Sequence, residues 1–194
     1  MKRIFDLVVS ILLLIVTAPL GLLVAAAIRF TSPGPVVYAG RRMGKDGKPF
    51  LMYKFRSMQV SGDGRGPGIT AADDPRITRV GRILRAAKID ELPQLVNVVR
   101  GEMSLVGPRP EAPEYVALYD QRQREVLQVR PGMTGPTQLL YRHEELLLHH
   151  DTVHQQYQAE LMPRKLESDL QYVYDHPFWH DVVLLLRTVG RLVR

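Results

Sequence analysis

A long apolar segment near the N-terminus constrains this chain more than any other feature of its sequence. Residues 7–28 are almost wholly apolar, and they reach the ~20 residues that an α-helix needs to cross a bilayer. Pro19 lies in the middle of the segment, where a proline removes one helix hydrogen bond and favours a kink or a break. The sequence therefore predicts a membrane anchor over residues 1–30 and one further domain over residues 31–194.

The anchor has three interpretations. A cleaved signal peptide is disfavoured, because Pro19 would directly follow the small residues at 16–18 that resemble a cleavage site. A spanning helix should carry its positive charge mainly on one side, yet Lys2 and Arg29 flank opposite ends. A re-entrant helix–break–helix would have halves of roughly 15–20 Å, too short for a hydrocarbon core of ~30 Å. The residues alone leave the second and third interpretations open.

The remainder of the chain indicates an α+β fold that is predominantly helical, with one small β-hairpin. Residues 36–38 and 50–55 have strand character, and the glycine-rich turn 44–49 lies between them. Residues 61–68 are too rich in glycine to order by themselves and predict a loop. Apolar periodicity predicts helices over residues 75–88, 90–100, 114–129, 144–161 and 178–194. The last of these is amphipathic, a pattern shared by membrane-surface helices and core-packing helices.

Two adjacent carboxylates, Asp90 and Glu91, are the leading candidates for chemistry. Asp90 is expected at a helix N-cap, where free backbone N–H groups and the helix dipole favour its ionised form. An ionised aspartate can attack phosphorus, and two neighbouring carboxylates can hold Mg²⁺. The alternative is that Asp90 is a plain cap and Glu91 a first-turn helper, which is the usual role of an isolated pair.

Basic residues around this pair favour phosphate chemistry. Arg85 lies five residues before Asp90, and Arg109 stands between two prolines that lower the cost of ordering it on a phosphate. Lys54 and Arg56 end a predicted strand and are expected to point at the same site. Arginine forks match phosphate oxygens well, so the four basic residues are candidate phosphate ligands.

Composition excludes several other classes. The chain has no cysteine, which rules out disulfides, thiolate catalysis and cysteine zinc sites. Its net charge of +6 suits nucleic acid, anionic lipid or a phosphorylated substrate. The chain carries none of the standard nucleic-acid-binding motifs, so a nucleic-acid partner is not expected. Histidines pair at four-residue spacing at 150/154 and 176/180, but neither pair has an obvious third ligand for zinc.

Several strings resemble those of bacterial sugar transferases, the monotopic polyprenyl-phosphate phosphoglycosyl transferases. They are SPGPV, GKDGKPF, YKFRSM, DDPRITRVGRILR, IDELPQLVNVVRGEMSLVGPRP and VRPGMTG. The resemblance runs in order from the anchor to about Gly135, and a D-x-x-YV string (Asp169, Tyr172, Val173) fits more loosely. The combination of DELPQL with MSLVGPRP is highly specific.

The resemblance implies an enzyme that moves a sugar-1-phosphate from a UDP-sugar to polyprenyl phosphate and releases UMP. It implies Mg²⁺ as cofactor and a place at the cytoplasmic face of the inner membrane, with interfacial helices contacting lipid. Asp90 then corresponds to the covalent nucleophile, and Glu91 assists by metal binding or proton handling. Arg85, Lys54 and Arg109 correspond to phosphate-binding residues. A re-entrant anchor with Pro19 as its break is also implied.

Some positions depart from the pattern. Ala18 replaces a common serine before the anchor proline, Lys88 and Ile89 precede the carboxylates, and Pro136 replaces a large apolar residue. With no further spanning segment ahead of the anchor, the expected type is the minimal form of the family. The alternative function is a non-catalytic membrane-surface protein that binds anionic lipid through basic helices. The sugar, the polyprenol length and the formation of a homo-oligomer are left open.

Overall fold

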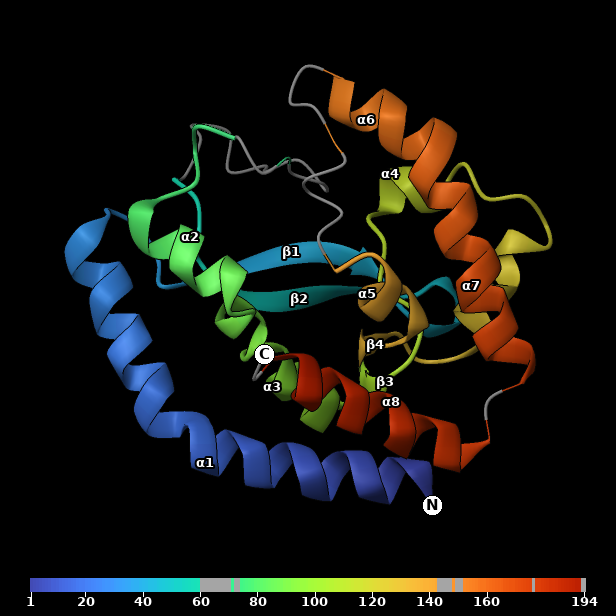
Figure 1. Ribbon diagram of the computed structural model, residues 1–194, viewed down its shortest axis with the longest axis horizontal. Coiled ribbons are helices and arrows are strands. Elements are labelled where there is room, and N and C mark those ends of the chain that lie inside the picture. Colours follow the sequence, from blue (N-terminus) through green and yellow to red (C-terminus); the bar gives the residue numbers. More distant parts are fainter. Residues whose placement is uncertain (60–70, 72–73, 143–147, 149–151, 176, 193–194) are drawn as a thin grey trace.

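The computed structural model describes residues 1–59, 71, 74–142, 148, 152–175 and 177–192. It confirms a mainly helical α+β fold with a small two-stranded hairpin (Figure 1). Its longer elements are α1 (Lys2–Thr31), β1 (Val37–Met43), β2 (Pro49–Phe55), α2 (Arg79–Ala86), α3 (Gln94–Arg100), α7 (Met162–Tyr174) and α8 (Phe178–Leu192). The predicted glycine-rich loop at 61–68 lies outside the described residues.

Helix α1 runs from Lys2 to Thr31 with Pro19 inside it, and it changes direction partway along its length (Figure 1), so the helix is bent without being interrupted. Its first half packs on α3, β3 (Ser104–Val106) and α8. Its second half places Val24 and Ile28 against Phe55 and Leu84. A proline removes only one hydrogen bond, and apolar packing of both halves on the same body compensates for that loss while the helix bends.

Both ends of α1 are attached to the rest of the chain. At the start, Lys2 pairs with the buried Asp181 of α8, and Asp6 accepts a hydrogen bond from Ser104 at 2.8 Å. At the other end, Ile28 is 1% exposed in the core. Most of the remaining surface of α1 is exposed and apolar, and α1 is the one helix in the described part of the chain long and apolar enough to cross a membrane.

Strands β1 and β2 form the predicted antiparallel hairpin, but β1 is longer than expected and extends to Met43. Lys54 lies opposite Tyr38 in the register. A second pairing was not predicted: β3 runs parallel to β4 (Gly132–Thr134). The two strands approach so closely that a Cβ on Gly132 would lie 2.1 Å from the backbone nitrogen of Gly107. This pairing brings the segment that carries Arg109 beside the loop before α5 (Pro136–Leu140).

Two apolar clusters flank the region between hairpin and C-terminal helices. One joins residues of β2, α3 and β3 to partly buried side chains of α1 and α8. The other joins α7 to α4 (Pro113–Val116), to η3 (Gln123–Gln128) and to a π-helical turn, η6 (Tyr157–Leu161). The candidate site lies between these clusters, so elements far apart in sequence hold it in place.

Several predicted helices differ from the structure. The helix expected at 75–88 begins only at Arg79, because Thr78 caps it by accepting a hydrogen bond from Gly81 N at 2.8 Å. The helix expected at 114–129 is wrong, since only α4 and η3 form there. The helix expected at 144–161 lies partly outside the described residues, and its end comprises α6 (Val153–Gln156) and η6, which lead into α7. The amphipathic C-terminal helix is confirmed as α8.

Candidate active site

Asp90 lies in a short 3₁₀ turn, η2 (Ile89–Glu91), that joins α2 to α3. The predicted N-cap role is wrong, because α3 begins at Gln94 with Pro93 before it. Lys88 adopts a left-handed conformation (φ 56°) that ends α2 and forces the chain into this tight turn. Asp90 is 5% exposed, and its Oδ1 is a buried oxygen with no hydrogen-bond partner among the described atoms.

The two carboxylates have opposite pKa shifts. Burial raises the pKa of Asp90, and Glu91 adds to the effect, while Lys54 and Arg85 oppose it. Desolvation thus opposes the ionised form of Asp90, whereas the sequence-based expectation considered only features that favour that form. Burial also works against ionisation of Glu91, but Lys54 and Arg109 outweigh it and lower its pKa to about 2.

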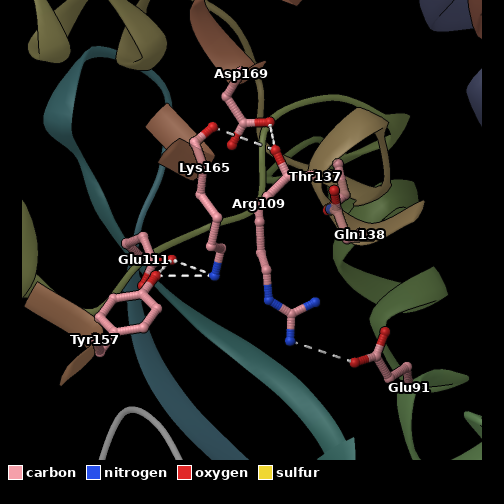
Figure 2. A network of polar contacts seen from close by, with 9 residues as sticks. Glu91, Arg109, Glu111, Thr137, Gln138, Tyr157, Lys165 and Asp169 are labelled. Atoms are coloured by element: carbon pink, nitrogen blue, oxygen red, sulfur yellow. Dashed lines mark hydrogen bonds and ion pairs between the residues drawn. The ribbon is translucent and has the colours of Figure 1, made fainter. Parts of the chain in front are cut away.

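Two of the predicted basic residues contact Glu91, and a third borders the same cavity. Lys54 Nζ lies 2.8 Å from Glu91 Oε1. Arg109 Nη2 lies 3.7 Å from the same oxygen, and Figure 2 shows this pair. Arg85 borders the same cavity as Asp90. The site thus combines two carboxylates with three cations drawn from β2, α2 and the segment after β3.

Arg56 is placed differently from the other three. It is 4% exposed, and its guanidinium donates to Pro33 O at 2.6 Å and to Ser32 O at 2.8 Å. Because β2 ends at Phe55, strand alternation no longer directs Arg56 to the side of Lys54. Arg56 also borders the cavity, but its described hydrogen bonds secure the chain after α1 rather than a phosphate position.

A cavity of about 710 Å³ connects these groups. Its polar part is bordered by the carboxylates and their cations, and by Glu111, Thr137, Gln138 and Lys165. Its apolar part is bordered by Leu13 of α1 and by Leu185 and Val189 of α8. The cavity therefore joins a charged region to an apolar wall that is formed by α1 and α8.

Sequence reasoning missed a polar network on the far side of Arg109 (Figure 2). Lys165 and Asp169 of α7 contact Glu111 and Thr137, which come from other parts of the chain. Of the residues in this network, only Asp169 belongs to one of the strings that resemble the family. The four-residue spacing of Lys165 and Asp169 on one helix face was the available signal.

The histidines do not form a metal site in the described residues. His154 Nδ1 lies 2.6 Å from the Tyr115 hydroxyl, and no group of three or more potential metal-ligating side chains occurs in the described ranges. Residues 150 and 176 lie outside those ranges. The two carboxylates suit a cation such as Mg²⁺, which needs few protein ligands when substrate phosphates supply the others. The unpartnered Oδ1 of Asp90 fits such a ligand role.

The chain belongs to the bacterial sugar transferase family, whose family model matches residues 1–194. It is 44% identical, over 99% of its length, to the UDP-glucose:undecaprenyl-phosphate glucose-1-phosphate transferase of Caulobacter vibrioides, and spans 69% of that protein. It is 37% identical, over 97% of its length, to the Escherichia coli protein of the same name, and spans 39% of it.

A third relative carries a different sugar in its name. The chain is 34% identical, over 99% of its length, to the UDP-N-acetylgalactosamine-undecaprenyl-phosphate N-acetylgalactosaminephosphotransferase of Aeromonas hydrophila, and spans 43% of it. The chain therefore covers less than half of the length of two of these three relatives. All three names contain undecaprenyl phosphate, two of them name glucose, and the third names N-acetylgalactosamine.

Proposed function

We propose that this chain is a phosphoglycosyl transferase that moves a sugar-1-phosphate from a UDP-sugar to undecaprenyl phosphate and releases UMP. The observation that carries the proposal is the grouping of Asp90 and Glu91 with Lys54, Arg85 and Arg109 around one cavity. The names of the three relatives support the same donor and acceptor classes.

The reaction would proceed in two displacements at phosphorus. In the first, a carboxylate oxygen of Asp90 attacks the β-phosphorus, the bond from that phosphorus to the bridging oxygen breaks, and UMP leaves. In the second, an oxygen of undecaprenyl phosphate attacks the same phosphorus, and the bond to Asp90 breaks. The product is a diphosphate-linked lipid sugar, and the aspartate is regenerated as a carboxylate. Asp90 Oδ1 is buried at the cavity with no described hydrogen-bond partner, which supports a chemical role for this carboxylate rather than a role in holding the turn.

The basic residues have two different roles in this proposal: one keeps Glu91 ionised, and others bind phosphate or act on Asp90. Lys54 keeps Glu91 ionised through its 2.8 Å contact. Arg109 Nη2 lies 3.7 Å from Glu91 Oε1, and the planar fork of its guanidinium matches the geometry of phosphate oxygens. Arg85 lowers the pKa of Asp90 against the effect of burial, which favours the attacking form. Positive charge around the pair also stabilises the charge that develops during transfer.

Asp90 and Glu91 would hold Mg²⁺ together with oxygens of the substrate. When bound, the ion would neutralise pyrophosphate charge and stabilise the departing UMP.

The position of α1 supports a re-entrant anchor. Both ends of α1 contact the same globular body, through Lys2 with Asp181 and through Ile28 with its core neighbours. A helix spanning the bilayer would separate its ends by the ~30 Å core and detach one of them. We therefore place the anchor in one leaflet, at the cytoplasmic face of the bacterial inner membrane. The apolar cavity wall from α1 and α8 then brings the acceptor phosphate to the site from headgroup depth.

The test is UMP release from a panel of UDP-sugars with Mg²⁺, with and without undecaprenyl phosphate. We expect acceptor-dependent release from one donor in the wild type, loss in Asp90→Asn, and loss on chelation of the metal. Glu167→Gln is a matched control, because Glu167 is an acidic residue in an exposed ion pair with Arg122. Donor-dependent labelling of Asp90 by a phosphosugar, read by mass spectrometry, would identify the intermediate. Full turnover in Asp90→Asn would refute the covalent step, and a lipid-binding scaffold would release no UMP.

A further inference from the structure

Helix α7 carries two buried polar side chains that the proposed chemistry does not use. Lys165 is 3% exposed and Asp169 is 5% exposed. They stand one turn apart on the same face of α7, and both are directed toward the segment that carries Arg109 (Figure 2). Burying such groups is costly unless they are paired, so their partners indicate what they do.

Asp169 holds the start of this segment. Its carboxylate accepts a hydrogen bond from the backbone N–H of Arg109 and another from the hydroxyl of Thr137. Residues 108 and 110 are prolines and have no backbone N–H. The Arg109 N–H is consequently the single backbone donor of residues 108–110, and Asp169 occupies it.

Lys165 holds the other end of this segment, at Glu111. Its Nζ lies 3.5 Å from Glu111 Oε1 and 2.9 Å from the Tyr157 hydroxyl, which also donates to Glu111. The backbone carbonyl of Glu111 accepts a further hydrogen bond from Met43 N at 2.9 Å. The segment 109–111 is thus fixed on both sides of Pro110.

We propose that Asp169 and Lys165 are positioning residues for the transfer reaction, which hold segment 109–111 so that the Arg109 guanidinium stays beside Glu91. An arginine side chain is long and has several rotatable bonds, so the place of its backbone decides where its guanidinium can reach. A displacement of about 1 Å at such a group can cost up to about 100-fold in rate. The inference rests on the proposed function of Arg109 in phosphate binding.

The first experiment measures UMP release by Asp169→Leu, which removes both acceptor oxygens at similar volume. We expect kcat/KM to fall about 10- to 100-fold. Asp169→Asn retains an acceptor oxygen for the Arg109 N–H and should recover most of the activity. Glu167→Gln, two residues away on the exposed face of α7, should behave as wild type.

A double-mutant cycle separates positioning from general stability. If Asp169 acts through Arg109, Asp169→Leu should cost less than about twofold when added to Arg109→Ala. A merely structural role would give the same fractional loss in both backgrounds, and that additive result would overturn the inference. Lys165→Met is measured in the same cycle, so the test survives if Asp169→Leu does not fold.

Amide hydrogen exchange gives a readout that does not depend on activity. Exchange at the Arg109 amide should accelerate at least about tenfold in Asp169→Leu and stay unchanged in Glu167→Gln. If exchange accelerates in Asp169→Leu but the wild type transfers no sugar phosphate, the proposed function is refuted. The finding that Asp169 of α7 holds segment 109–111 would still be supported. Transfer by the wild type with unaltered exchange and additive losses would refute the positioning role alone.

Discussion

Asp169→Asn should stabilise the protein at neutral pH. Burial raises the pKa of Asp169 from its ordinary value of 3.8 to about 7. Thr137, Lys165 and the backbone N–H of Arg109 favour the charged form, and Glu111 disfavours it. Desolvation wins because the side chain is 5% exposed, so ionising it in the folded state carries a net cost. Asparagine has nearly the same shape and does not ionise.

The magnitude follows from the difference between folded and unfolded pKa values. The shift from 3.8 to about 7 is close to three pH units. At ~1.4 kcal/mol per unit, ionisation of Asp169 lowers the free energy of unfolding by about 4 kcal/mol. Between these two pKa values the folded state retains a proton that the unfolded state has released. The protonated side chain therefore makes its full contribution to the free energy of unfolding below about pH 4. That contribution is lost as the pH rises to about 7.

The assay is chemical unfolding in detergent micelles, comparing wild type with Asp169→Asn at several pH values. We expect the free energy of unfolding to be similar for the two proteins near about pH 4, and higher in the variant by about 2–4 kcal/mol above about pH 7. The reasoning is refuted if the difference between them does not change with pH, or if the variant is the less stable protein at neutral pH.

Three further substitutions test the site and its support. Arg56→Met should lower the free energy of unfolding by about 3 kcal/mol while leaving the KM for the UDP-sugar unchanged, as unfolding and kinetic assays will measure. Gly81→Ala should prevent folding, read by circular dichroism, because its Cβ would lie 1.9 Å from a backbone oxygen, whereas Gly190→Ala meets no atom within 4 Å and should fold. Lys54→Met should raise the pKa of Glu91 and move the acid limb of the pH–rate profile upward, and an unmoved limb would contradict the ion pair.

Local patterns in the sequence predicted the hairpin, the C-terminal helix and the family of the chain. They failed where a distant contact decides the outcome. Strands β3 and β4 have three residues each, too few to show an alternating pattern, and the close approach of the chain beside them leaves no room for a Cβ at Gly107 or Gly132. The helix expected at 114–129 had suitable periodicity, but packing against α7 and η6 divides it.

The basic residues illustrate the same limit at the site. Lys54 and Arg56 are two positions apart, which on a continuing strand would place both beside the carboxylates. The strand ends between them, and Arg56 turns to the carbonyls that follow α1. Whether a side chain faces the site thus depends on where its strand ends, which is the least certain part of a sequence-based assignment.

The carboxylate pair shows why adjacency in sequence does not give equal chemistry. Glu91 reaches Lys54 and is held ionised, while Asp90, in the same turn, points into a desolvated position with one oxygen unpartnered. Burial raises the pKa of Asp90, while Lys54, Arg85 and Lys88 act in the opposite direction, so the positive charge around the turn favours the charged form of this carboxyl. The tight turn set by Lys88 therefore contributes to the division of roles between two identical functional groups.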